Sequence, residues 1–338
     1  MSENYPIDFV VTWVDGNDPV WQAEKAKYSP NKNVDNRNVR FRDWDNMQYW
    51  FRAVEKFAPW VNKIHFVTYG HLPKWLNIDN PKLNIAKHSD FIPQKYLPTF
   101  SSQPIELNLH RINGLAERFV YFNDDMFLLR PVKRELFFAG KDCLPTDFAI
   151  TSTISTTTKE DMMPFVKLNC VTILNGHFDK KEQMKKHFSK WVNLAYGWNA
   201  LRNLIFYGQH RFKGFANNHL AFSFLKSEYE DIWEKEYEAL ADTSSHKFRS
   251  KLDLDNWLIR YWQLTRGNFY PIGRHVKGKV YEIYNGIEQN QELFKVIENQ
   301  TMPMICINDN DNVDFEPMKE RIKQAFDKIL PEKSSFEK

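Results

Sequence analysis

Apolar residues along the first 130 positions alternate between short runs typical of strands and longer runs with helical spacing. The first run is rich in β-branched residues and ends in turn residues, as expected for a strand buried on both faces. The predicted strands are Ile7–Val14, Lys63–Gly70, Lys82–Ser89 and Arg118–Asp125, and the predicted helices between them are Arg42–Trp60 and Ile105–Gly114. Strands that alternate with helices predict an α/β fold built on a mostly parallel, Rossmann-like sheet.

The pattern changes beyond residue 150, where helical spacing dominates and predicts a largely helical C-terminal half. The polar stretch Ser152–Asp161 predicts a surface loop. In a later helical segment, we expect Asp253 to cap the start and Gly267 to close the end. The chain finishes with the short apolar strand "MICIN", an Asn/Asp cluster and an amphipathic helix over Pro317–Leu330. That helix fits either packing on its own domain or contact with an anionic membrane surface.

Composition narrows the class of protein. Charged residues make up 26% and hydrophobic residues 42% of the 338 positions, as in an ordinary folded protein. The net charge of +3 argues against a nucleic-acid binder, which needs a dense basic face. Three widely spaced cysteines suit neither a disulfide framework nor a zinc site. The N-terminus lacks the features of a signal peptide, and no run approaches the about 20 apolar residues of a membrane span, so we expect a cytoplasmic protein.

Acidic residues follow the ends of two predicted strands. Asp15 comes after the first, and Asn123, Asp124 and Asp125 end the fourth, inside the apolar stretch "RFVYFNDDMFLL". Because ligands bind beyond the carboxyl ends of parallel strands, these side chains are expected to share one rim. Carboxylates there can hold Mg²⁺ or Mn²⁺ against a diphosphate. Asn-Asp pairs are also common in turns, and both interpretations apply to the later cluster "INDNDN".

Several stretches, in order along the chain, resemble the Stealth family of sugar-phosphate transferases. "DFVVTWVDGNDPVW" is similar to its first conserved region, and the stretch from "RFRDWDNMQYW" to "RFVYFNDDMF" to its second. "NNHLAFSFLKSEYEDIWEKE" with "HKFRS" resembles the third region and "MICINDNDN" the fourth. The resemblance extends from Ile7 to about Asn312. The family includes bacterial capsular and cell-wall polysaccharide phosphotransferases and the eukaryotic enzyme that adds N-acetylglucosamine 1-phosphate to lysosomal glycoproteins.

The resemblance implies a sugar-1-phosphate transferase. Such an enzyme moves a hexose or N-acetylhexosamine 1-phosphate from a nucleotide sugar, here a UDP-sugar, to a sugar hydroxyl. It forms phosphodiester linkages of a capsular or cell-wall polysaccharide and releases the nucleoside monophosphate. The implied partners are the donor, Mg²⁺ or Mn²⁺, and a lipid-linked or polymeric glycan acceptor, with peripheral contact at the inner face of the plasma membrane. No nucleic acid is expected.

The resemblance also implies one catalytic domain over 1–338 with a fold like that of nucleotide-sugar transferases of the GT-A type. Its nucleotide-sugar-binding α/β core is expected at 7–130 and a mainly helical acceptor and catalytic region at 151–300. Residues 301–338 are expected to complete the core with a strand and the terminal helix.

By motif match, the resemblance places the catalytic roles on Asp125, His219 and Arg249, with His219 as general base and Arg249 on phosphate. The implied metal ligands are Asp124, Asp125, Asn308 and Asp309. The predicted substrate-binding residues are Trp13, Asp15, Gly16, Arg42, Asp43, Arg52, Arg111 and Asn123. Many relatives carry prolines after the histidine, where this chain reads "HLAFSF", so the rim carboxylates Asp15 and Asp309 remain alternative bases.

Two other functions fit the same residues. A conventional metal-dependent glycosyltransferase uses the same cation and diphosphate but attacks the sugar carbon and releases nucleoside diphosphate. A non-catalytic carbohydrate-binding protein would instead use the aromatic residues, 15% of the chain, to stack on sugars.

Overall fold

A five-stranded sheet with the order β3-β2-β1-β4-β8 forms the centre of the computed structural model, which describes residues 5–29, 42–156, 158, 161–310 and 312–338. Four strands are parallel, namely β1 (Ile7–Thr12), β2 (Ile64–Thr68), β3 (Leu83–Lys87) and β4 (Arg118–Phe122). The edge strand β8 (Phe222–Leu225) runs antiparallel to β4. The predicted mostly parallel, Rossmann-like sheet is therefore confirmed.

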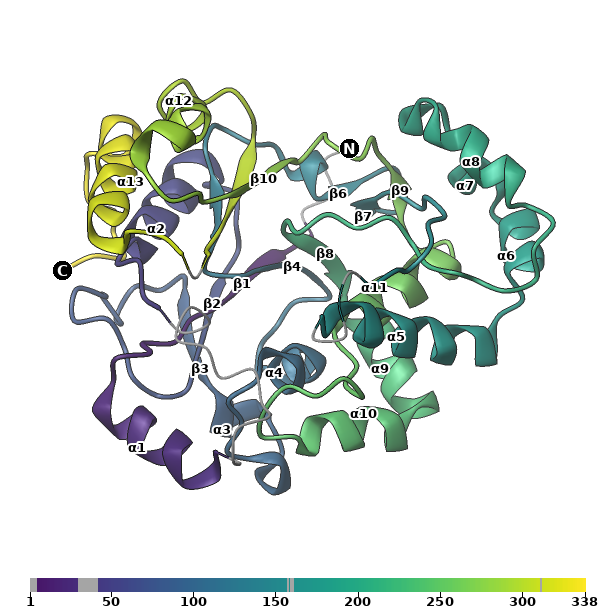
Figure 1. Cartoon of the computed structure of the whole chain (residues 1–338), viewed down its shortest axis with the longest axis horizontal. Coiled ribbons are helices and arrows are strands. Elements are labelled where there is room, and N and C mark those ends of the chain that lie inside the picture. The colour runs from purple at the N-terminus through teal and green to yellow at the C-terminus, as the bar shows by residue number, and fades with distance from the viewer. Residues whose placement is uncertain (1–4, 30–41, 157, 159–160, 311) are drawn as a thin grey trace.

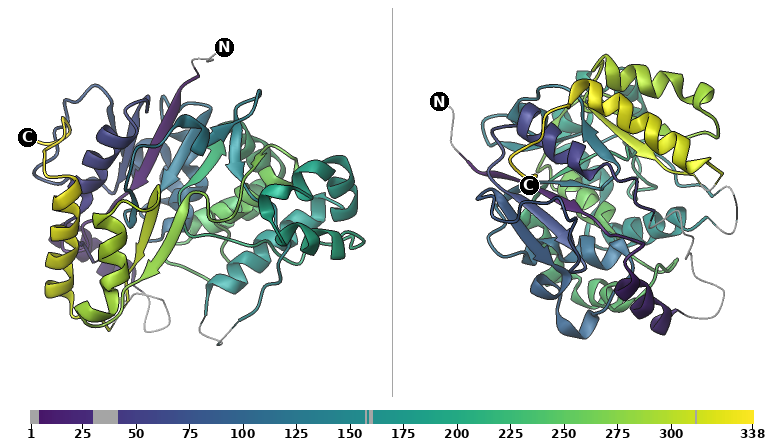
Figure 2. Two further views of the ribbon diagram at one scale, coloured as in Figure 1. Left: turned by 90° about the horizontal axis from the view of Figure 1, so that it is seen from above. Right: turned by 90° about the vertical axis from the view of Figure 1, so that its left-hand side faces the viewer.

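Helices cover both faces of this sheet (Figures 1 and 2). Phe9 and Val11 of β1 pack into one hydrophobic core and Val10 into another, which explains the continuous apolar run of this strand. The first core includes α2 (Met47–Phe57), α12 (Gln291–Glu298) and α13 (Phe315–Ile329). The second includes α4 (Ser102–Asn108), α5 (Met163–His177), α9 (Lys226–Lys235), α10 (Tyr237–Ser245) and α11 (Asn256–Thr265). The remaining α-helices of the described residues are α1 (Pro19–Tyr28), α3 (His88–Phe91), α6 (Lys180–Lys186), α7 (Phe188–Trp191) and α8 (Asn199–Ile205).

A second sheet joins distant parts of the chain. Its strands are β10 (Gly278–Glu282), the late strand β11 (Met304–Asn308) and β5 (Met126–Leu128), which pairs antiparallel with β11. Because β5 follows β4 directly, residues 123–125 form the connection between the central sheet and the second one. A third small sheet contains β6 (Phe138–Ala139), β7 (Leu144–Asp147) and β9 (Tyr270–Pro271).

Several predicted helix boundaries were wrong. The helix expected over Ile105–Gly114 is α4, which begins at Ser102 and ends at Asn108. The helix predicted from Arg42 is α2, which begins at Met47, so Arg42 lies in a segment without regular structure. The N-cap of α11 is Asp255, whose Oδ1 accepts a hydrogen bond from the backbone N–H of Trp257 at 3.0 Å. Asp253 instead accepts hydrogen bonds from His246 at 2.6 Å and from the backbone of the same loop.

The terminal helix α13 packs on its own domain. Its apolar residues Met318, Ile322, Phe326 and Ile329 are buried in the first core. Arg321 and Lys328 pair with Glu298 at 2.8 and 2.9 Å. The membrane alternative considered for this helix therefore has no free apolar face to support it. None of the helices among the described residues has the length and apolar character needed to cross a bilayer.

Candidate active site

A cleft opens beyond the carboxyl ends of β1 and β4, where the strand order reverses. Its cavity volume of about 710 Å³ lies within the range of small-molecule sites. Ten of the fourteen predicted site residues line it: Trp13, Arg42, Asp43, Asn123, Asp124, Asp125, His219, Arg249, Asn308 and Asp309. Most of the predicted site residues therefore lie together at the switch point of the sheet.

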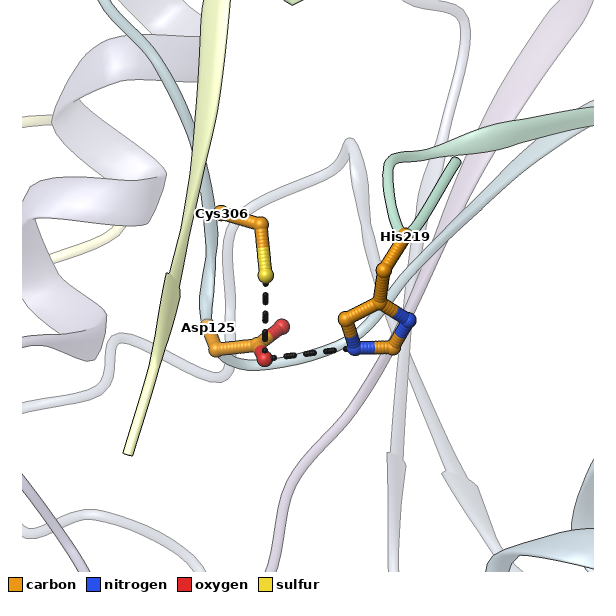
Figure 3. Close-up of side chains that lie close together, drawn as sticks. All are labelled: Asp125, His219 and Cys306. Carbon is orange, nitrogen blue, oxygen red and sulfur yellow. Dashed lines mark hydrogen bonds and ion pairs between the residues drawn. The ribbon is translucent and has the colours of Figure 1, made fainter. Parts of the chain in front are cut away.

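Asp125 and His219, which line this cleft, lie close to the buried Cys306 (Figure 3). The Asp125 Oδ2 atom lies 3.5 Å from His219 Nε2 and accepts a hydrogen bond from the Cys306 thiol at 3.2 Å. Burial raises the pKa of Cys306 well above its usual value, so the thiol stays protonated and donates. The backbone carbonyl of Asp125 also accepts a hydrogen bond from the backbone N–H of Ile307 at 2.8 Å. This bond fastens β11 to residues 123–125, which we call the acidic turn.

The acidic turn has the properties of a site for a hard cation. The Asp125 Oδ1 atom is buried and has no hydrogen-bond partner among the described residues. Burial, together with the charges of Asp125 and Asp43, raises the pKa of Asp124 to about 7. The turn therefore has one unpartnered carboxylate oxygen and one carboxylate whose ionised form is disfavoured, and a cation would compensate both, since Mg²⁺ and Mn²⁺ prefer carboxylate oxygens. Asp124 and Asp125 therefore fit the predicted metal, with Asn308 at the end of β11 lining the same cleft.

The charge balance of the described cleft points the same way. Three Lys or Arg side chains line it, and the acidic residues outnumber them. The cations are Arg42, Lys167 and Arg249, and the carboxylates are Asp43, Glu106, Asp124, Asp125, Asp255, Glu282 and Asp309. A diphosphate ligand would add further negative charge, so its binding in this cleft favours an accompanying cation.

The loop that carries His219 is held by a buried polar network. Arg260, 1% exposed, donates two hydrogen bonds to Asp147 at 2.8 Å and one to the Asn217 side chain at 2.7 Å. Asn217 also donates to the Tyr261 hydroxyl at 2.8 Å. Burial alone would lower the pKa of His219, but the nearby Asp125 carboxylate raises it overall. The imidazole is thus placed beside a carboxylate that stabilises its protonated form.

Two buried acids in the cleft were missed by the sequence reasoning. Glu106 is 7% exposed and Asp255 3% exposed. Burial raises the pKa of Glu106, while Arg249 opposes the shift. Burial, and then the charge of Glu106, raises the pKa of Asp255 to about 8. A carboxylate within the apolar run "PIELNL" was the available signal for Glu106, and Asp255 could be read only as a helix cap.

Asp309 has a different partner from the predicted metal. Its carboxylate accepts hydrogen bonds from Arg42 at 2.6 and 2.9 Å and from the Trp44 indole at 3.1 Å. Both carboxylate oxygens are therefore occupied. Asp309 thus holds Arg42 at the edge of the cleft, and its role as a metal ligand stays a prediction.

Arg52 and Arg111 do not reach the cleft, contrary to their predicted substrate-binding role. Arg52 makes a bidentate pair with Glu337 at 2.7 and 2.9 Å and donates to the Leu330 carbonyl at 2.9 Å. It therefore fastens the end of the chain to α2. Arg111 donates to Asn108 at 3.0 Å and lies 4.6 Å from the Trp233 ring centroid, in a separate surface depression.

Asp15 and Gly16 lie in the turn that follows β1 but do not line the cleft. The backbone N–H of Asp15 donates to His71 Nε2 at 2.8 Å, and its side chain accepts from the Asn17 backbone. The Gly16 carbonyl accepts from the Gln22 side chain at 2.7 Å. These bonds brace the turn, and a substrate contact at either residue stays a prediction.

A smaller cavity of about 160 Å³ adjoins the cleft at the end of β1. The two cavities share Trp13, Ser102, Asn123, Asp124 and Arg249. The other residues that line the smaller cavity include the aromatic side chains of Trp21, Phe100 and Phe248. An aromatic enclosure next to an acidic centre suits a ligand with one flat apolar part and one charged part.

Comparison with known proteins identifies the family. Residues 5–33 match conserved region 1 of the Stealth proteins and residues 40–144 match conserved region 2. The capsular polysaccharide phosphotransferase WcwK of Streptococcus pneumoniae is 42% identical over 100% of both chains. The receptor polysaccharide phosphotransferase WefC of Streptococcus gordonii is 41% identical over 98% of each, and the exopolysaccharide phosphotransferase cps2G of Lactiplantibacillus plantarum is 39% identical over 100% of this chain and 98% of its own.

Among solved structures, the galactosyltransferase LgtC in complex with donor and acceptor sugar analogs aligns with 95% of this chain and 96% of its own. The TM-score is 0.38 at 9% identity, so the assignment of the fold rests on the strand order described above. Three phosphotransferases are 39% to 42% identical to this chain over 98% or more of both lengths. Two conserved regions also match, and the acidic turn lies inside the second. This chain belongs to the Stealth family of polysaccharide phosphotransferases.

Proposed function

We propose that the protein transfers a hexose or N-acetylhexosamine 1-phosphate from a UDP-sugar to a hydroxyl of a capsular or cell-wall glycan. The observation that carries the proposal is the convergence of Asp125 and His219 in the cleft at the switch point of the sheet. A transferase of this kind needs a base for the acceptor and a centre that tolerates a diphosphate, and the two lie side by side here.

Different residues of the cleft accept the proton, stabilise the resulting charge and bind the phosphates. The acceptor oxygen forms a bond to the β-phosphorus while the bond from that phosphorus to the oxygen bridging to the α-phosphate breaks. The hydroxyl proton moves to His219 Nε2, and Asp125 Oδ2, 3.5 Å away, stabilises the resulting imidazolium. Nucleoside monophosphate leaves with the bridging oxygen. Arg249 and Arg42, both lining the cleft, bind phosphoryl oxygens.

Asp124, Asp125 and Asn308 would hold the metal, and the orphaned Oδ1 of Asp125 is the atom that supports this. When bound, Mg²⁺ or Mn²⁺ supplies neutralising charge to the diphosphate and the leaving group. The smaller cavity at the end of β1 is the proposed position of the nucleobase, because the aromatic side chains of Trp21, Phe100 and Phe248 line it.

The acceptor is proposed to be a lipid-linked or polymeric glycan at the inner face of the plasma membrane. Met163 and Lys167 of α5 line the cleft, and they belong to the region proposed to select the acceptor.

The identity of the released nucleotide tests the proposal. The protein is incubated with UDP-sugars, Mg²⁺ or Mn²⁺ and an oligosaccharide acceptor, and nucleotides are separated by ion exchange. Release of UMP with ³¹P-detected phosphodiester in the glycan supports the proposal. Release of UDP with a phosphorus-free product would identify a conventional glycosyltransferase, and glycan binding without turnover a binding protein. Asp125→Asn is the inactive control, matched by Asp79→Asn, which removes an exposed carboxylate outside the cleft.

A further inference from the structure

A helical segment projects from the end of the molecule opposite α13. It consists of α6, α7 and α8, which lie together at the right-hand edge of Figure 1 and again in the left view of Figure 2. The segment follows α5, whose first turns line the cleft at Met163 and Lys167. With 15 residues, α5 is about 22 Å long. The projecting segment therefore begins roughly one helix length from the cleft.

The outer side of this segment is apolar. Trp198, Leu201 and Ile205 are 87%, 48% and 77% exposed and are spaced i, i+3 and i+7, so they share one side of α8. The preceding Leu194 is 97% exposed. Six of the fifteen large exposed hydrophobic residues of the described chain lie between positions 188 and 205. We call this surface the α7–α8 face; its apolar members are Phe188, Leu194, Trp198, Leu201, Leu204 and Ile205.

The exposure is built into the fold. Asn203 is fully buried and fastens α8 to the body of the protein through the backbone of Thr151 and Ala149 at 2.8 and 2.6 Å. It also donates to the Trp191 carbonyl of α7 at 2.5 Å. Lys190 fastens α7 in the same way, by donating to the backbone carbonyls of Gly267 and Phe269. A polar side chain thus faces inward on α8 while its apolar side faces solvent, the reverse of an ordinary surface helix.

The charges around the α7–α8 face are almost all positive. Among the exposed residues between 180 and 213, the only carboxylate is Glu182, and Asp179 just before them pairs with His210. The exposed cations of the same span are Lys181, Lys185, Lys186, Arg202, Arg211 and Lys213. Apolar side chains with tryptophan, bordered by lysine and arginine, fit the interface of an anionic bilayer. Lysine is depleted at protein–protein interfaces, which makes a protein partner the weaker fit.

We propose that the α7–α8 face docks the protein on an anionic lipid surface. The inserted side chains are Leu194, Trp198, Leu201 and Ile205, and the lysines around them contact lipid phosphates. The biological use of this contact rests on the proposed function, since it would bring a lipid-linked acceptor within about one helix length of the cleft. The docking itself requires neither donor nor acceptor.

Vesicle sedimentation of the full chain tests the docking. We expect it to pellet with phosphatidylcholine vesicles containing about 30% phosphatidylglycerol and to remain in the supernatant with phosphatidylcholine alone. Trp198→Ser/Ile205→Ser should weaken binding at least about tenfold, and Lys185→Glu/Lys186→Glu should do the same on the anionic vesicles. Ile78→Ser/Val276→Ser, which removes exposed apolar residues elsewhere, is the matched control and should bind like the unmodified protein.

The proposal is overturned if the unmodified protein pellets with neither vesicle, or if the Trp198/Ile205 variant binds as tightly as the control. It is also overturned if that variant converts a dimer into a monomer in light scattering while vesicle binding is absent, because the face then joins two copies. Circular dichroism confirms that each variant is folded. UMP release with a soluble acceptor is measured separately, so a failed phosphotransfer and a failed membrane contact are distinguishable.

Discussion

Replacing Asp255 by asparagine should stabilise the protein, and increasingly so as the pH rises. Asp255 is 3% exposed, caps α11 and lies near Glu106. Asparagine is an equally good N-cap, so the hydrogen bond from Trp257 survives the change. What the change removes is a carboxyl group whose ionised form is disfavoured by burial and by a neighbouring acid.

The pKa of Asp255 is raised from 3.8 to about 8 in the folded state. This direction fixes the sign of the pH dependence of the unfolding free energy. A raised pKa means that the protonated group contributes stability below pH 3.8, and that this stability is lost as the pH rises towards about 8. Each pH unit in this window costs about 1.4 kcal/mol, so about 3–4 kcal/mol should be lost between about pH 5 and 8. The variant should lack this loss.

Urea unfolding followed by tryptophan fluorescence at pH 5, 6, 7 and 8 measures the effect. The difference in unfolding free energy between Asp255→Asn and the unmodified protein should grow steadily across the series. Asp18→Asn, at the half-buried N-cap of α1, is the control and should follow the pH profile of the unmodified protein. A difference that stays constant from pH 5 to 8 would show that Asp255 is ionised in the folded state and would refute the reasoning.

Three further predictions concern the site and the end of the chain. Asp125→Asn, or chelation of divalent metal with EDTA, should lower UMP release at least about 100-fold, and full activity in chelator would contradict the metal assignment. His219→Ala should lower turnover by roughly 10²–10⁴ with donor affinity nearly unchanged, whereas Arg249→Ala should weaken donor binding as well, as calorimetry with UDP-sugar will show. Arg52→Ala should lower the unfolding free energy by about 3 kcal/mol, because it leaves the buried Glu337 carboxylate without its partner. Turnover of the folded enzyme should stay unchanged.

The central sheet was predictable because its strands are continuous apolar runs separated by turn residues. The polar residues at their ends were predicted as parts of strands, but the strands stop at Thr12 and Phe122. Trp13 and the acidic turn are then free to line the cleft. The approach of His219 to Asp125 was expected only through the family resemblance, since no local pattern joins positions so far apart.

The errors and omissions have a common physical cause. Arg52 resembled Arg42 in sequence, but a helix that starts at Met47 turns Arg52 towards the end of the chain. Glu106 and Cys306 look like ordinary helix and strand residues, and only the tertiary fold brings Glu106 to the cleft and Cys306 to Asp125. Local periodicity reports which face of an element is buried and contains no information about which distant element covers it.

The bond between Ile307 and Asp125 has a consequence for biosynthesis. Cys306 and Asp125 are 181 positions apart, and β11 ends only 30 residues before Lys338. All five strands of the central sheet are translated before β11, so the sheet can form while the acidic turn still lacks one wall. Cys306 can reach Asp125, and Asn308 the cleft, only after β11 has been translated. We therefore expect a chain that lacks β11 to be inactive, because this wall of the cleft is missing.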